Sequence, residues 1–365
     1  MPFGNHFLKA CRMPALLALM SSAALAAPAP APGPAYRVFV SNEKSGDLTV
    51  INGDDFSVMG KIDVGKRPRG IHASPDGKTL YVALSGTPIG GPPRLDARGN
   101  PIFERGKDDD EDDADADKSA DGIGIVDVAA HKLVGKIAVG SDPEEFSVSR
   151  DGTRLYVSNE DVKTASVVNI TAGKVEHIIP VSQEPEGVTT TPDGRQVYIT
   201  CEAGGDIFVF DTVTFTTVGH FKVEGRPRSV DFLPGSAIGF VPSESVGQVN
   251  VIDTTQPKVL KVITLPKGSR PMRVRVALDG RKVYVSNGRA GTVSVLDSRS
   301  YELLDTITVG TRPWGIALSP DGKYLYAANG PSNDVSVVDL QTNKEIKRIA
   351  AGQSPWGIAI APRPR

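Results

Sequence analysis

A sequence unit recurs along most of this chain. Residues 309–330 read VGTRPWGIALSPDGKYLYAANG, and a similar stretch, VGKRPRGIHASPDGKTLYVALSG, occupies residues 64–86. Each unit has a proline at the same place, and successive prolines are 75, 42, 42, 44, 42 and 42 residues apart. A period of about 40 to 45 residues is typical of four-stranded propeller blades. Seven blades are therefore predicted, anchored at Pro68, Pro143, Pro185, Pro227, Pro271, Pro313 and Pro355.

Each unit has the pattern of four short strands, here named a to d in chain order. In the last complete unit these are GIALSP (315–320), YLYAAN (324–329), VSVVDL (335–340) and KEIKRIAAG (344–352). We expect the Asp-Gly pair between strands a and b to form a two-residue type I′ hairpin turn, which requires positive φ at both residues. Apart from the N-terminal apolar run, no window shows a sustained helical period.

The two ends of the repeat region complement each other. The region opens on a strand of type b at residues 36–42 and ends on a strand of type a at residues 356–362. Pairing the C-terminal strand with the first three would complete one blade from both termini, which leaves only short, protected sheet edges. The predicted fold is therefore all-β: a seven-bladed β-propeller of four-stranded blades, closed in this way.

The N-terminus has the composition of a secretory signal peptide. Residues 1–26 contain Lys9 and Arg12, then the apolar run ALLALMSSAALA, and end on Ala-Leu-Ala. Residues 27–34 read as a Pro/Ala leader, and residues 35–365 contain the propeller. No other apolar run approaches the length of a membrane span. We therefore expect a periplasmic protein without a membrane span.

Cysteine and histidine usage excludes several kinds of chemistry. Cys11 lies in the signal peptide, so Cys201 is the only cysteine of the mature chain, and neither a disulfide within it nor a Cys-x-x-Cys-His haem attachment site can form. The mature histidines have no zinc-ligand spacing, and no nucleophile elbow or Walker A loop is present. We predict no catalytic residue, metal or cofactor, and the lack of a basic stripe argues against nucleic acid.

The 75-residue spacing contains an acidic insertion between strands b and c of one blade, at residues 86–121. Eight of the eleven residues from Lys107 to Asp117 are acidic, a composition typical of disordered, solvated segments. An EF-hand beginning at Asp113 is excluded, because Lys118 and Gly124 occupy the places that require Gly and Glu. The open alternatives are a solvated segment, loose cation binding, and an electrostatic steering arm for a basic partner.

The residues beside each proline change from blade to blade while the framework stays constant. In a propeller the d–a and b–c connections share one face, so these residues are expected at the mouth of the central channel. They form either salt bridges between neighbouring blades or a recognition surface for a ligand or partner, and the placement of both tryptophans here favours recognition. The candidate binding residues are Arg67, Arg69, Asp142, Glu144, Glu184, Glu186, Arg226, Arg228, Arg270, Arg312, Trp314 and Trp356.

The residue four places after each proline is expected to approach the channel. Three such residues are polar and chemically capable: His72, Asp231 and Arg275. Asp231 and Arg275 occupy neighbouring blades and are expected to pair. His72 alone reads as a satisfied channel residue rather than as a base.

The repeat SPDGKYLYAANG…VSVVDL…VG resembles the YVTN-type β-propeller repeat, over residues 36–362. The order of its variants is similar to that of the PQQ-dependent catabolism-associated β-propeller proteins. The matching stretches include RPRGI (67–71), DPEEF (142–146), EPEG (184–187) and PWGIAI (355–360). That resemblance implies a periplasmic accessory protein encoded with alcohol-oxidising quinoprotein and transport systems, and it does not imply that this chain binds PQQ.

The function predicted is therefore that of a non-enzymatic accessory protein, linked to PQQ-dependent alcohol catabolism, that recognises a partner or ligand at the channel mouth. The partner expected is a periplasmic protein such as a quinoprotein dehydrogenase or a solute-binding protein. One alternative is a hydrolase or lyase of the lactonase-like propeller type, for which Glu160, Glu202 and His72 are the components available. Another is a haem-handling or electron-transfer accessory protein, because the repeat also resembles the haem d1 propeller of nitrite reductases.

Overall fold

A computed structural model describes residues 35–89 and 116–362. The predicted signal peptide (1–26) and leader (27–34) lie outside the described residues, as does the central part of the acidic insertion. The order of that insertion therefore stays a prediction.

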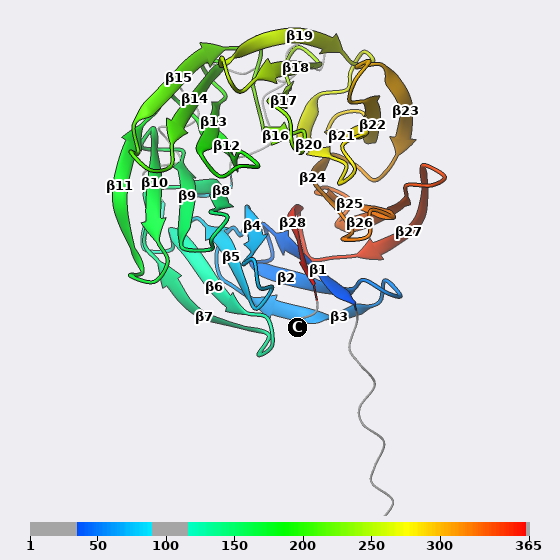
Figure 1. Ribbon diagram of the computed structural model, residues 1–365. Coiled ribbons are helices and arrows are strands. Elements are labelled where there is room, and N and C mark those ends of the chain that lie inside the picture. The colour runs from blue at the N-terminus through cyan, green and yellow to red at the C-terminus, as the bar shows by residue number, and fades with distance from the viewer. Residues whose placement is uncertain (1–34, 90–115, 363–365) are drawn as a thin grey trace, which may run out of the picture. The chain divides into compact units, whose positions relative to one another are not determined.

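The described residues form twenty-eight strands and no helix, and the strands make seven four-stranded antiparallel sheets arranged in a ring (Figure 1). Blade 1 contains β28 (Pro355–Pro362), β1 (Tyr36–Asn42), β2 (Asp47–Asn52) and β3 (Val58–Asp63); blade 2, β4 (Ile71–Ala73), β5 (Thr79–Leu84), β6 (Gly122–Asp127) and β7 (Lys132–Ile137); blade 3, β8 (Pro143–Val148), β9 (Arg154–Asn159), β10 (Thr164–Asn169) and β11 (Lys174–Pro180); blade 4, β12 (Pro185–Thr190), β13 (Gln196–Cys201), β14 (Asp206–Asp211) and β15 (Thr217–Lys222); blade 5, β16 (Asp231–Phe232), β17 (Ile238–Ser243), β18 (Gln248–Asp253) and β19 (Lys258–Thr264); blade 6, β20 (Pro271–Val276), β21 (Lys282–Asn287), β22 (Thr292–Asp297) and β23 (Leu303–Thr308); blade 7, β24 (Pro313–Leu318), β25 (Tyr324–Asn329), β26 (Asp334–Asp339) and β27 (Lys344–Ala350).

Blade 1 closes the ring with strands from both ends of the chain. The C-terminal β28 is the innermost strand of this blade and pairs antiparallel with β1, with Phe39 opposite Ala359. In Figure 1 the red β28 lies beside the blue β1. The predicted fold class and its mode of closure are confirmed.

The core lies between neighbouring blades. The second and third strands of each blade are covered on both faces, so their apolar residues run continuously, as in β26, whose four central residues are all buried. The outermost strand has one face in solvent, and β27 accordingly buries only one of its seven residues. Between blades 1 and 2, for example, Phe39 and Leu48 belong to the same apolar cluster as Leu80.

The turns between the two inner strands differ from the predicted type I′ hairpins. Gly77 has a φ of 69°, but Asp76 has no positive φ. The Gly77 N–H donates to the carbonyl of Ser74 (2.9 Å), and the Ser74 N–H donates to the carbonyl of Thr79 (2.8 Å). Because Pro75 fixes its own φ near the value that a type I turn needs at its second position, the chain forms a type I turn ending on a left-handed glycine. The prediction of a two-residue type I′ turn was therefore wrong.

The backbone around each anchoring proline has a shared conformation. A β-bulge follows the proline in blades 1, 3, 4, 6 and 7: in blade 3, Pro143 pairs with Asn159, but Phe146 pairs with Val157, so the inner strand carries one extra residue. The residue before the proline is left-handed in six units: Arg67, Asp142, Glu184, Arg270, Arg312 and Ser354. Since the conformation recurs whatever the side chain, it belongs to the repeat rather than to one functional position.

Candidate functional site

The residues beside the prolines lie on one face of the ring together with the loops between strands b and c. The N–H of Glu160 donates to the carbonyl of Asp142 (3.0 Å), and the N–H of Glu202 donates to the carbonyl of Glu184 (2.8 Å). These bonds join the d–a and b–c connections of each blade. We call this face the mouth; it is the end of the channel at which the innermost strands begin.

Arg69 is the centre of an ion-pair cluster between blades 2 and 3. Its side chain is 2% exposed and pairs with both Asp142 and Glu144. Arg67 adds a contact from its Nη1 to Asp142 Oδ2 (3.6 Å). Burial alone would raise the pKa of Asp142, but the two guanidinium groups lower it below its ordinary value. Desolvation and repulsion from Glu144 and Asp142 raise the pKa of Glu160, which lies beside them.

A second cluster surrounds Arg228 between blades 4 and 5. The Arg228 guanidinium contacts Glu186 and Glu202, and its Nε donates to Glu244 Oε2 (2.8 Å). Arg226 also pairs with Glu202. Burial would raise the pKa of Glu244, but Arg228 and Arg226 lower it on balance. Two further ring residues stand at the edge of this cluster: Glu184, with its Oε2 3.6 Å from Arg226 Nη2, and Arg270, with its Nη1 3.9 Å from Glu244 Oε1.

The two tryptophans are in contact. The rings of Trp314 and Trp356 stack with centroids 5.7 Å apart and planes inclined by 23°. The guanidinium carbons of Arg228 and Arg312 lie 5.0 and 5.1 Å from the Trp314 ring, a cation–π arrangement. Arg312 is exposed, and among the described residues no carboxylate oxygen lies within 4.0 Å of it. The aromatic sector of the mouth therefore keeps an accessible cation, whereas the acidic sectors are neutralised internally.

An ion pair that sequence reasoning missed crosses the channel. Glu145 of blade 3 pairs with Arg273 of blade 6, and the two side chains are 3% and 11% exposed. Glu145 Oε1 also lies 2.7 Å from His72 Nε2, and Arg273 stands over the Trp356 ring at 5.4 Å. Burial would raise the pKa of Glu145, but Arg273 and His72 lower it far below its usual range. We call Glu145, Arg273 and His72 the channel plug.

A signal for this pair was present in the sequence, two residues after each proline. A Cβ at Gly315 would stand 2.5 Å from the Trp356 carbonyl oxygen, and one at Gly357 would stand 2.6 Å from the Arg69 carbonyl oxygen. Neighbouring inner strands thus touch backbone to backbone, which favours small residues. The residues two places after the seven prolines are Gly70, Glu145, Gly187, Ser229, Arg273, Gly315 and Gly357. One acidic and one basic residue among five small ones would have indicated an ion pair.

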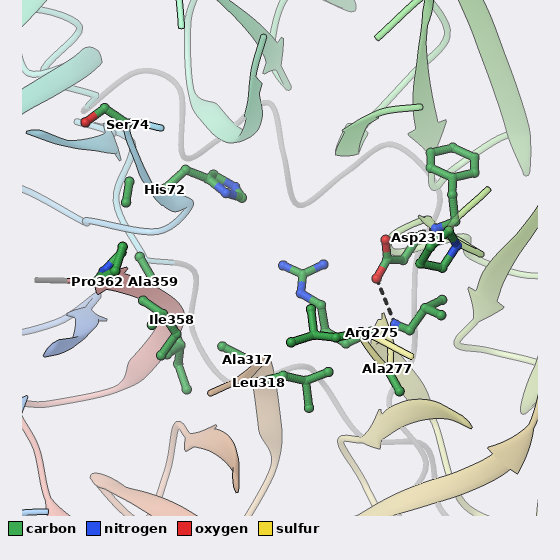
Figure 2. A pocket seen from close by; sticks show the side chains of 16 residues that line it. His72, Ser74, Asp231, Arg275, Ala277, Ala317, Leu318, Ile358, Ala359 and Pro362 are labelled. Atoms are coloured by element: carbon green, nitrogen blue, oxygen red, sulfur yellow. Dashed lines mark hydrogen bonds between the residues drawn. The ribbon is translucent and has the colours of Figure 1, made fainter. Parts of the chain in front are cut away.

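A cavity of about 500 Å³ lies on the other side of the plug, toward the a–b turns. Figure 2 shows its lining, which includes the predicted channel residues His72, Asp231 and Arg275 and an apolar wall containing Leu318 and Ile358. These three polar residues are therefore separated from the mouth by Glu145 and Arg273, and they do not join the ring of residues beside the prolines.

The predicted ion pair between Asp231 and Arg275 is not formed. The Asp231 carboxylate accepts instead from the N–H groups of Phe232 and Val276, both at 2.8 Å. In the part of the chain that the structure describes, no ion pair within 4.0 Å joins Asp231 to Arg275. Burial raises the pKa of Asp231, and Arg275 opposes that shift without reversing it. Asp231 sits at a strand end, where unpaired backbone N–H groups compete for its oxygens.

The base of the acidic insertion adjoins the mouth. The N–H of Gly86 donates to Asp121 Oδ1 (2.7 Å), which joins the two ends of the insertion. Asp121 Oδ2 accepts from the Asp142 N–H (3.2 Å) and thereby links this base to the Arg69 cluster. Lys118 pairs with Asp161 of blade 3 (2.6 Å). The insertion therefore leaves and re-enters the fold beside the predicted ring.

Within residues 35–89 and 116–362, no three His, Cys, Asp or Glu side chains are grouped as a metal site would require. Nor does any helix long and apolar enough to cross a membrane occur in that part of the chain.

The fold and the channel define this chain as a seven-bladed β-propeller whose channel is closed by a buried ion pair. Residues 235–363 match the sequence profile of the YNCE-like beta-propeller family. A search of curated protein sequences finds no significant match.

Among solved structures, the periplasmic gluconolactonase of Pseudomonas aeruginosa is similar with a TM-score of 0.67 and 18% identity, over 89% of this chain and 99% of that one. Hydrazine synthase of Kuenenia stuttgartiensis matches with a TM-score of 0.65 and 20% identity, over 82% and 91% of the two chains. A dihydro-heme d1 dehydrogenase matches with a TM-score of 0.63 and 16% identity, over 89% and 75%. At these identities the likeness concerns the fold alone, which serves many functions.

Proposed function

We propose that this chain is a non-enzymatic β-propeller that, after export to the periplasm, binds a partner protein at the mouth and serves PQQ-linked alcohol catabolism as an accessory protein. The signal-peptide composition of residues 1–26 supports export. The order of the repeat variants, which resembles that of the PQQ-dependent catabolism-associated propellers, supports the metabolic link.

The stacked tryptophans with their arginines are the observation that carries this proposal. Binding energy in protein interfaces concentrates in rigid aromatic and arginine side chains surrounded by well-packed neighbours. Trp314 is partly exposed, rests on the buried Trp356, and has Arg228 and Arg312 against it. Because Arg228 is also held by carboxylates, the Trp314 ring is fixed before any partner arrives, which lowers the entropic cost of binding.

The chemistry of this sector favours an acidic contact on the partner. Arg312 is the exposed cation there, and the carboxylates of blades 3 to 5 are already paired with arginines of the ring. A quinoprotein dehydrogenase or a solute-binding protein with an acidic patch beside an apolar one is the partner we propose.

The experiment is a pull-down from periplasmic extract of alcohol-grown cells of the source bacterium, with the mature chain immobilised. Trp314→Ala and Arg312→Ala should each weaken capture of a dehydrogenase or solute-binding protein, by about tenfold or more for the tryptophan. Arg195→Ala, a substitution of an exposed arginine in an a–b turn, is the matched control and should leave capture unchanged. Failure of the wild-type chain to capture either kind of protein, or equal capture by Trp314→Ala, would show the proposal to be wrong.

A lactonase-like hydrolase is the second candidate, because a buried carboxylate is hydrogen-bonded to an imidazole at the edge of the cavity. Glu145 Oε1 lies 2.7 Å from His72 Nε2, an arrangement that can orient a general base. Glucono-lactone hydrolysis that is measurable for the wild-type chain and abolished by His72→Ala would support this candidate. The haem-handling alternative rests on resemblance and fold likeness.

A further inference from the structure

We propose that the cavity at the end of the channel opposite the mouth is a second binding site, which takes a small organic carboxylate with a short apolar chain and uses Arg275 as its anion-binding residue. The site is distinct from the mouth and does not depend on the function proposed for it. Its walls come from the inner strands or adjoining residues of blades 1, 2, 5, 6 and 7.

Arg275 differs from the arginines of the ion-pair clusters. Arg69 and Arg228 each contact two or three carboxylates. Among the residues described, Arg275 has no carboxylate oxygen within 4.0 Å, and its one hydrogen bond runs from Nη1 to the carbonyl of Val274 (3.3 Å). A guanidinium group has five N–H donors in a planar fork that matches a carboxylate. Most of its donor capacity is therefore available to a ligand.

The nearest acid in the cavity does not satisfy this demand. Both oxygens of Asp231 accept backbone N–H groups at 2.8 Å, and these bonds hold the carboxylate against the wall formed by β16 and β20. In Figure 2 the guanidinium of Arg275 extends into the open space between His72 and Asp231, and the dashed line from Asp231 leads away to the backbone. The negative charge of Asp231 partly offsets the positive charge of Arg275, but the guanidinium N–H donors remain available to a ligand.

The other charged groups around the cavity are committed to one another. Arg273 pairs with Glu145, and His72 contacts the same carboxylate. Burial and the nearby Arg273 lower the pKa of Arg275, which is the shift expected when a cation lacks a close counter-ion. A carboxylate entering the cavity would supply that counter-ion.

The rest of the lining suits an apolar chain. Ala317, Leu318, Ile358 and Ala359 line one side of the cavity, and Figure 2 shows them on the side of blades 7 and 1. A volume of about 500 Å³ falls in the range of small-molecule sites, which combine an apolar lining with a few placed polar groups. Phosphate or sulfate would meet the guanidinium but leave this wall without a partner, so a carboxylate with a hydrocarbon chain fits better.

The plug sets the direction of access. Glu145 and Arg273 cross the channel between this cavity and the mouth, so a ligand enters from the face of the a–b turns. A partner protein seated on the mouth would leave that entrance open. The two sites can therefore be tested independently.

The experiment is isothermal titration calorimetry of the mature chain with acetate, hexanoate, hexan-1-ol and hexylamine. We expect hexanoate to bind with a Kd of about 1 mM or tighter, and acetate at least tenfold more weakly because it leaves the apolar wall uncovered. Hexan-1-ol and hexylamine have the same chain without the negative charge, and each should also bind at least tenfold more weakly than hexanoate.

Two substitutions locate the site. Arg275→Gln removes the charge and should weaken hexanoate about tenfold to a hundredfold. Leu318→Trp fills the cavity while retaining Arg275 and should abolish binding even if Arg275→Gln fails to fold. Arg289→Gln, an exposed substitution in the same blade as Arg275, is the matched control and should leave affinity unchanged.

Absence of hexanoate binding at about 10 mM, or equal binding of hexanoate and hexan-1-ol, would overturn the proposal. So would a folded Arg275→Gln chain with wild-type affinity. Capture of a partner protein at the mouth should be the same for Arg275→Gln and for the wild-type chain, so failure of this proposal and failure of the proposed function give different results.

Discussion

Arg69 offers the sharpest test of the ion-pair clusters at the mouth. Replacing it with methionine keeps much of its volume but removes the cation that faces Asp142 and Glu144. These carboxylates are 4% and 8% exposed, so solvent cannot take over the role of the guanidinium. Removing one partner of such a buried pair costs about 3–5 kcal/mol. In a chain of this size that corresponds to a fall in Tm of about 4–7 °C at pH 7.

The loss should depend on pH with a defined sign. The folded-state pKa of Asp142 is lowered in the wild-type chain, so its ion pair contributes stability above the unfolded pKa of about 3.9 and loses it as pH falls through the lower folded value. In Arg69→Met the carboxylate lacks its counter-ion, and burial favours the protonated form. The difference in Tm between the two proteins should therefore be largest near neutral pH and should shrink below about pH 4.

Thermal unfolding followed by circular dichroism at pH 7 and pH 3 measures both effects. Lys78→Met removes an exposed lysine paired with Asp76 at 3.7 Å and should change Tm by no more than about 1 °C. A triple variant that adds Asp142→Asn and Glu144→Gln to Arg69→Met should recover most of the lost stability, because the two carboxylates that Arg69 paired with most closely are no longer charged. If Arg69→Met behaves like Lys78→Met, the cluster does not stabilise the fold as argued.

Two further predictions concern packing and reactivity. Gly315→Ala should lower the free energy of unfolding by about 1–3 kcal/mol, because its Cβ would stand 2.5 Å from the Trp356 carbonyl oxygen. The control Gly135→Ala, whose Cβ would have its nearest neighbour 3.8 Å away, should be neutral or slightly stabilising. Urea unfolding of both variants measures the difference. Burial raises the pKa of Cys201 to about 12, so iodoacetamide should leave native Cys201 unmodified at pH 8 and alkylate it in urea, and rapid labelling of the native chain would contradict this.

The repeat determined how much of the fold could be predicted from the sequence. The spacing of the prolines predicted seven blades, and the strand types at the two ends predicted that β28 would complete the blade of β1. The predicted strand at residues 36–42 agrees with β1 at both ends. These features follow from periodicity and from the alternation of apolar runs with turns, which a single sequence displays directly.

The backbone detail around the prolines was beyond such reasoning. The left-handed residue before the proline is an arginine, aspartate, glutamate or serine, none of which is a glycine that would announce a positive φ. The bulge after the proline requires no particular residue type either, because the position directly after the proline is Glu144 in one repeat and Trp314 in another. The mouth residues were therefore identified from their distance to the proline, and salt bridges between neighbouring blades, such as Arg69 with Asp142, were one of the two alternatives left open. The plug beneath them was not predicted.

The plug also changes what the channel can do. A seven-bladed ring with small residues two places after each proline would leave an open axis, but Glu145 and Arg273 fill it from opposite sides, in blades 3 and 6. Against the effect of burial, Arg273 and His72 lower the pKa of Glu145 far below its usual range, so this carboxylate stays ionised near neutral pH. Replacing either partner alone would leave an unpaired buried charge and would destabilise the fold, so the pair that closes the channel also stabilises the propeller. The two proposed sites, the mouth with its tryptophans and the cavity with Arg275, consequently lie on opposite sides of the plug, so coupling between them through the channel would require the plug to move.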